Sequence, residues 1–168
     1  MKIKNFVGNK SGLACLQQPK FEAGLIDITS ACSIGASIGK TGDITKSITK
    51  TLRSLAGWNK TEWKDFHPFV QSLGNKKSFA IDAFHPGSGI AVEVELSNQT
   101  AFSHDLMKLD AAYKFNKCSL GVAVALSDSL RMSLSGKTVG YLTFGKACTW
   151  LQVVGETISV PLLVVELG

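Results

Sequence analysis

Two apolar segments of the chain carry carboxylates at positions that a buried strand normally gives to hydrocarbon. Residues 79–84 read FAIDAF and residues 89–96 read GIAVEVEL, with the sequence HPGS between them. A Pro-Gly-Ser sequence is typical of a tight turn, so the two segments predict an antiparallel hairpin. A buried carboxylate needs a cation, hydrogen bonds or a proton to offset the water it loses. The acids therefore restrict the environments in which this hairpin can fold.

The period of a β-strand predicts where these acids point. Successive side chains leave opposite faces, so Glu93 and Glu95 share one face. The other face of the same strand receives Val92, Val94 and Leu96. The turn brings Asp82 of the preceding strand toward Glu93, which places carboxylates on neighbouring strands.

Carboxylates in this arrangement suit a hard metal ion. Asp82, Glu93 and the main-chain carbonyl of Val94 form an oxygen-only ligand set, and Mg²⁺ keeps several waters when few protein carboxylates hold it. One retained water is a candidate nucleophile. The alternative interpretation is a hairpin with one solvated face, on which alternating Glu and Val is ordinary. The alternation by itself leaves both interpretations open.

The spacing Asp-x10-Glu-x-Glu across two strands resembles the PD-(D/E)xK nuclease core, in the variant where Glu replaces the usual Lys. About the central half of the chain is similar to type II restriction endonucleases of the BamHI, BglII and BstYI group. The similarity rests on the segments ID, GIAVEVELSN, HDLMK and LGVAVAL between residues 81 and 126. In those enzymes a metal-binding hairpin is followed by a helix and another core strand.

The resemblance implies Mg²⁺-dependent cleavage of double-stranded DNA at a short palindrome by a homodimer with one metal site per subunit. Asp82 and Glu93 correspond to the metal-binding acids, and Glu95 to a position that is Glu in BamHI-like and Gln in BglII-like sites. An additional upstream acid of BamHI-like sites makes Glu62 a candidate ligand. The alternative for Glu62 is a first-turn acid that interacts with the dipole of a predicted helix.

The resemblance also implies which residues read the DNA sequence. Ser97 and Asn98 follow Glu95 where BglII-like enzymes carry base-contacting residues, and Asn presents both a donor and an acceptor to a base edge. A second candidate recognition segment contains Ser127, Asp128 and Arg131. A strand-ending turn is the alternative interpretation of Ser97 and Asn98.

The role of Glu95 and the activity itself have alternatives. Because Glu95 lacks the positive charge of the usual Lys, it is a candidate to accept a proton from the attacking water or to bind a second metal ion. A nuclease-like fold also serves as a catalytically inactive DNA-binding or protein-interaction module, since fold does not dictate function. A structure-specific repair nuclease with the same core is a further alternative.

The composition is compatible with both the nuclease and the DNA-binding interpretation. The 168 residues predict one domain over residues 1–168, and a net charge of +5 with a pI near 9.1 suits a polyanionic partner. No run approaches the roughly eighteen apolar residues of a membrane span, so we expect a cytoplasmic protein without a membrane partner. Residues 35–41 (GASIGKT) have three rather than four residues between the glycines, which argues against a phosphate-binding loop and a nucleotide cofactor.

Periodicity predicts an α/β fold with a mixed β-sheet flanked by helices, in the manner of a restriction-endonuclease-like core. One predicted helix starts at Asp43 and ends before Gly57, and a second spans 61–73. A third contains the apolar series Phe102, Leu106, Leu109 and Tyr113. The predicted strands besides the hairpin are 21–29, 118–126, 140–144 and 159–166, and 30–42 is a predicted loop.

Overall fold

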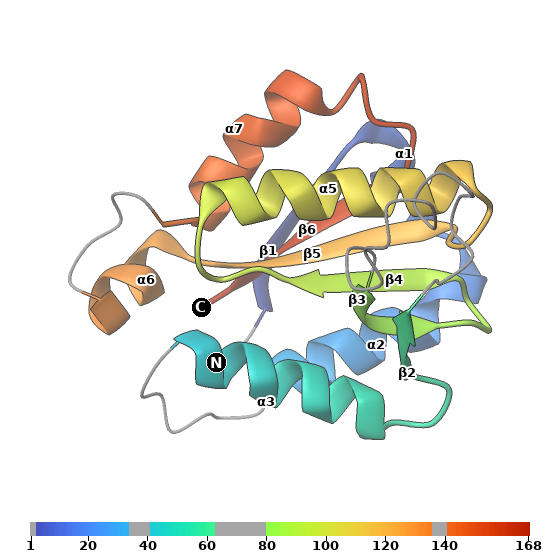
Figure 1. The fold of residues 1–168 in the computed structure, drawn as a ribbon, viewed down its shortest axis with the longest axis horizontal. Coiled ribbons are helices and arrows are strands. Elements are labelled where there is room, and N and C mark those ends of the chain that lie inside the picture. Colours follow the sequence, from blue (N-terminus) through green and yellow to red (C-terminus); the bar gives the residue numbers. More distant parts are fainter. Residues whose placement is uncertain (1–2, 34–40, 63–79, 136–140) are drawn as a thin grey trace, which may run out of the picture.

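The computed structural model describes residues 3–33, 41–62, 80–135 and 141–168. These residues contain a mixed sheet of six strands in the order β1-β6-β5-β4-β3-β2 (Figure 1). The central strands β4, β5 and β6 are parallel, whereas β1 is antiparallel to β6, and β3 is antiparallel to both β4 and β2. The strands are β1 Ile3–Gly8, β2 Asn59–Glu62, β3 Ala80–His85, β4 Ile90–Val94, β5 Leu120–Leu126 and β6 Leu162–Leu167.

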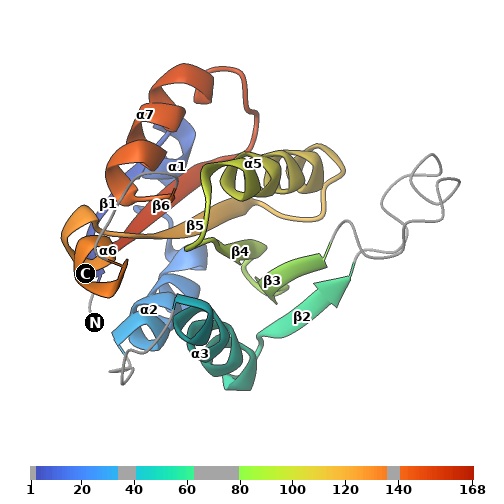
Figure 2. The same ribbon diagram turned by 60° about the vertical axis from the view of Figure 1, so that its left-hand side comes forward.

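Helices cover both faces of the sheet, as Figures 1 and 2 show. One face carries α2 and α3, and the opposite face carries α5 and α7, while α6 follows the end of β5. The helices are α1 Lys10–Cys15, α2 Pro19–Ser33, α3 Thr41–Ser54, α5 Gln99–Lys114, α6 Asp128–Ser135 and α7 Phe144–Val154. The predicted α/β class with a mixed sheet between helices is confirmed.

The strand period divides the core into two layers. In β4, Val92 and Val94 pack with the α2 and α3 side chains, whereas Ala91 packs with the layer under α5 and α7. All five residues of β4 are buried. Because Glu93 falls on the same face as Ala91, this packing directs its carboxylate toward α5 rather than into solvent.

Several predicted elements are confirmed with small changes of boundary. The β3–β4 hairpin forms with Ala83 paired to Val92, which puts Asp82 and Glu93 on neighbouring strands one residue beyond that pair. The helix predicted from the 102–113 series is α5, whose Phe102, Leu106 and Leu109 are buried. The predicted strands 118–126 and 159–166 correspond to β5 and β6, and the helix predicted to start at Asp43 is α3.

Other predictions are wrong, and each error has a local cause. Residues 21–29 belong to helix α2, because their buried positions recur with a helical period rather than alternating. The predicted loop 30–42 is helical at 30–33 and at 41–42, and residues 34–40 lie outside the described residues. The predicted strand 140–144 is wrong over its described residues, since 141–143 form no strand and Phe144 begins α7 after the N-cap Thr143. The predicted helix 61–73 instead starts inside β2, and its remainder lies outside the described residues.

Candidate active site

The carboxylate of Asp82 is held at the start of the hairpin and stays open to solvent. Its Oδ2 accepts a hydrogen bond from the Val94 N–H at 2.9 Å. Arg53 of α3 donates from Nε to the Asp82 carbonyl at 2.7 Å, and its guanidinium lies 4.0 Å from Oδ1. These contacts fix the residue from one side while its side chain keeps about a third of its surface exposed.

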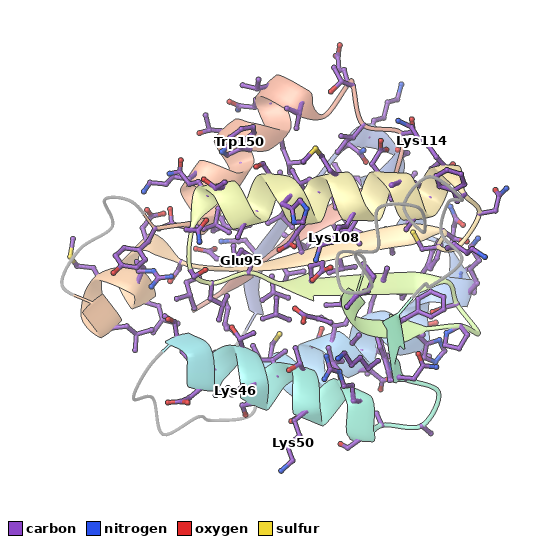
Figure 3. All side chains as sticks on the ribbon, viewed as in Figure 1. Lys46, Lys50, Glu95, Lys108, Lys114 and Trp150 are labelled. Atoms are coloured by element: carbon purple, nitrogen blue, oxygen red, sulfur yellow. The ribbon has the colours of Figure 1, made fainter. Side chains whose placement is uncertain are left out.

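Glu93 has the opposite environment, because it is buried under helix α5. Only 3% of its surface is exposed. The Lys108 ammonium lies 2.6 Å from Glu93 Oε1 and 2.7 Å from Asp105 Oδ1, and it donates to the Ala80 carbonyl at 3.4 Å. Figure 3 shows Lys108 reaching from α5 over the sheet. The contact between the Lys108 ammonium and Glu93 Oε1 is therefore a close, buried ion pair.

The protonation of this cluster reflects burial and an imbalance of charge. Burial raises the pKa of Glu93 to about 9, and the Asp105 carboxylate adds to the shift while Lys108 opposes it. Burial also raises the pKa of Asp105. The two carboxylates in turn raise the pKa of Lys108 against the effect of its own burial. Two acids facing one ammonium favour one retained proton on the carboxylate pair.

Glu95 lies just beyond the end of β4 and turns toward the N-terminus of α5. Its Oε1 accepts hydrogen bonds from the Asn98 N–H at 3.1 Å and from the N–H and hydroxyl of Ser97. The Asn98 side chain caps the helix by accepting from the Ala101 N–H at 2.7 Å. Ser97 and Asn98 are therefore turn and cap residues here, with exposed side chains that leave base contact a prediction.

The second predicted recognition segment is mostly enclosed. The Ser127 hydroxyl accepts from the Leu130 N–H at 3.1 Å and is buried, whereas Asp128 is exposed. Arg131 is 1% exposed, and its guanidinium lies over the Tyr141 ring at 4.5 Å. A base contact by Arg131 requires the side chain to leave this position.

The charges of the site suit a metal ion, whereas the described side chains do not form a complete ligand set in this arrangement. Among the described residues, no group of three His, Cys, Asp or Glu side chains is arranged to hold an ion. The donor set is nevertheless suitable, because the buried acids Glu93 and Asp105 face a single cation and Asp82 lies on the adjacent strand. Glu62 pairs with Ala80 through the backbone and so lies one strand from Asp82, and its side chain lies outside the described residues.

The mixed sheet with its acid-bearing hairpin has the architecture of a restriction-endonuclease-like core. A family model described as Restriction endonuclease BglII/BglIII matches residues 11–167. The match spans nearly the whole chain, and the protein belongs to this family, which places it among the DNA-cleaving endonucleases. No curated protein matches the sequence. None of the helices in the described ranges is long and apolar enough to cross a membrane.

Sequence reasoning missed two charged residues of the site, Asp105 and Lys108. They lie three residues apart within the HDLMK segment and flank the buried face formed by Phe102, Leu106 and Leu109. An Asp and a Lys at this spacing beside an apolar face was the available signal, because such a pair meets on the helix surface. Nothing in the sequence pointed to Arg53 as part of the site, because its contact with Asp82 joins two separate elements.

Proposed function

We propose that the protein is a Mg²⁺-dependent endonuclease that hydrolyses phosphodiester bonds of double-stranded DNA at a short palindromic site, as a type II restriction enzyme. The observation that carries the proposal is the pair Asp82 and Glu93 on adjacent strands of the hairpin, in a chain whose family consists of restriction endonucleases. We further propose a single nuclease domain that acts as a homodimer, because a palindrome presents two equivalent strands to two equivalent sites.

In this proposal Asp82, Glu93 and the Val94 carbonyl hold the metal ion, with Glu62 as an additional ligand. A bound Mg²⁺ ion polarises the scissile phosphate and lowers the pKa of a bound water. Asp82 is suited to this task because the Val94 N–H and Arg53 orient it without covering it. Glu95 is oriented by the first amides of α5, and it either accepts the proton of the attacking water or holds a second ion.

A basic row on α3 supports contact with the DNA backbone. Lys46, Lys50 and Arg53 are spaced by four and three residues, so they share one face of the helix. With Thr49 and Ser54 they line a hollow of about 410 Å³, and Figure 3 shows Lys46 and Lys50 pointing away from the body of the protein. Because Arg53 also touches Asp82, a phosphate chain along this row leads to the acids.

Sequence discrimination is the proposed role of Ser97 and Asn98, which are exposed beside Glu95, together with Ser127, Asp128 and Arg131. Phosphate contacts orient the protein, whereas groups that reach the base edges discriminate sequence. Of the second segment, Asp128 is the residue already exposed, so we place it ahead of the enclosed Arg131.

A nuclease-like module that binds DNA without cutting it is the second candidate. The observation that favours it is the contact of Lys108 with Glu93, which puts an ammonium where a nuclease needs a free carboxylate. The two candidates differ in whether bound metal reaches Glu93.

Incubation of the pure protein with mixed plasmid and genomic DNA, with Mg²⁺ or with a chelator, tests the proposal. Discrete fragments that require Mg²⁺ and disappear in Asp82→Ala are the expected result. Asp43→Ala, an exposed acid in the first turn of α3, is the matched control and retains cutting. Random degradation would favour a non-specific or structure-specific nuclease, and binding without cutting would favour the module.

A further inference from the structure

Helix α5 brings a carboxylate and an ammonium into the site, and the proposed ligand set uses neither. Asp105 is 8% exposed, and Lys108 joins it to Glu93. Burying charges is costly unless the partners fit closely, so a buried triad of this kind needs a reason beyond stability. On the same helix, Lys114 pairs with Asp110 at 2.7 Å, and its side chain is 55% exposed. The two pairs have the same chemistry, and only the Lys108 pair is enclosed.

The Lys108 ammonium occupies a position surrounded by oxygen. Glu93 Oε1 and Asp105 Oδ1 lie 2.6 and 2.7 Å from Nζ, and the Ala80 carbonyl lies at 3.4 Å. Carboxylate and carbonyl oxygens are also the ligands that hard divalent cations prefer, with waters completing the shell. The ammonium therefore marks a position where oxygen donors already converge.

Charge explains why an ammonium is a weaker occupant than a divalent ion. When both are ionised, Glu93 and Asp105 carry two negative charges, and Lys108 neutralises only one of them, so the metal-free pair retains a proton. A divalent cation at the same position balances both carboxylates without that proton. Lysine is able to withdraw, because its ammonium sits on a flexible four-carbon stem whose torsions move Nζ without moving the helix.

We infer that the Lys108 ammonium fills a cation position shared by Glu93 and Asp105, that a divalent metal ion displaces it, and that Asp105 is thereby a ligand of the loaded site. The inference rests on the proposed metal-dependent activity of the same site. It assigns opposite effects to two neighbouring residues: Asp105 favours metal binding, and Lys108 competes with it.

Calorimetric titration with Mg²⁺ and Mn²⁺, without DNA, measures these effects on the full chain. We expect Lys108→Met to bind metal about tenfold or more tightly than the wild type, and Asp105→Asn to bind it about tenfold or more weakly, which is the usual scale for groups around a metal site. Lys114→Met is the matched control and keeps the wild-type affinity. Lys108→Arg retains the competing charge, so it lacks the gain in affinity.

Thermal unfolding with and without Mn²⁺ gives a second measure of metal binding, which stays usable when a variant is less stable than the wild type. A ligand that binds the folded state stabilises it in proportion to its affinity, so the rise in Tm on adding metal should be larger in Lys108→Met than in the wild type. If Lys108→Met does not fold, Lys108→Gln removes the same charge with a polar side chain. Equal or weaker metal binding on removal of Lys108 overturns the inference, as does metal binding by neither protein.

The titration separates this inference from the proposed function. Tighter metal binding by Lys108→Met in a protein that cuts no DNA supports the cation exchange and rejects cleavage. Mg²⁺-dependent cutting by the wild type, with unchanged metal affinity in Lys108→Met, supports cleavage and rejects the exchange.

Discussion

The two strands of the hairpin hold their acids by contrasting means. On β3, Asp82 and Arg53 lie 4.0 Å apart with about a third of each side chain exposed. On β4, Glu93 and Lys108 lie 2.6 Å apart with 4% and 12% of their side chains exposed. An exposed pair contributes little because water screens it, whereas each partner of a buried pair depends on the other. Asp82 is thus placed for access, and Glu93 for tight control of its charge.

The largest expected effect is the same for both acids. If both acids hold the metal, Asp82→Ala and Glu93→Gln should each lower Mg²⁺-dependent DNA cleavage on the order of a thousandfold, since the Lewis acid supplies several kcal/mol. Single-turnover cleavage rates measure this loss. Glu166→Gln, a strand carboxylate on β6 that contacts Asn5, is the control. Full activity in either acid variant would remove that acid from the site.

Removing the basic partner of each acid should separate the two ion pairs by their effect on stability. Lys108→Met leaves two buried acids without their cation, and we expect it to lower the free energy of unfolding of the metal-free protein by about 3–5 kcal/mol. Arg53→Met breaks an exposed pair and one hydrogen bond, with an expected loss of about 1 kcal/mol. Urea unfolding at neutral pH compares the variants. Equal losses would mean that burial does not distinguish the two ion pairs.

The pH dependence of stability should come from the buried cluster around Glu93. The pKa of Glu93 is raised to about 9, so the folded protein keeps a proton that the unfolded chain releases near pH 4.5. Folding stability of the metal-free protein therefore falls as pH rises from about 5 to about 9. Chemical unfolding across this range measures the slope, which Glu93→Gln should flatten. A slope that persists in Glu93→Gln would assign the effect to other groups.

The smallest expected effect concerns the basic row on α3 and its contact with DNA. Lys50→Ala should weaken DNA binding severalfold and reduce the slope of log affinity against log salt concentration by about 1, because one phosphate contact is lost. Fluorescence anisotropy at several salt concentrations, with Ca²⁺ in place of Mg²⁺, measures the slope. Lys114→Ala on α5 serves as the control lysine. An unchanged slope in Lys50→Ala would remove the basic row from the DNA interface.

Sequence patterns succeeded where one local period dominates. The alternation in β4 predicted the hairpin, and the apolar series from Phe102 predicted α5. They failed in α2, because residues 21–29 resemble a short apolar strand in sequence. The helical period is seen only in the positions that are buried in the structure, such as Ile28, Ala31 and Cys32. They also failed at Phe144, where an apolar residue after an N-cap begins a helix.

The amino-acid order by itself determined that Glu93 shares a face with its alternate neighbours and that Asp82 lies across the turn from it, because strand geometry is local. Tertiary packing decided which residues contact the face that carries Glu93. The Asn98 cap and the burial of Phe102 set the rotation of α5, and this rotation brings Lys108 to Glu93 across fifteen positions of sequence. The period of a strand or helix specifies the face from which each side chain points, whereas contact between distant segments depends on how whole elements pack.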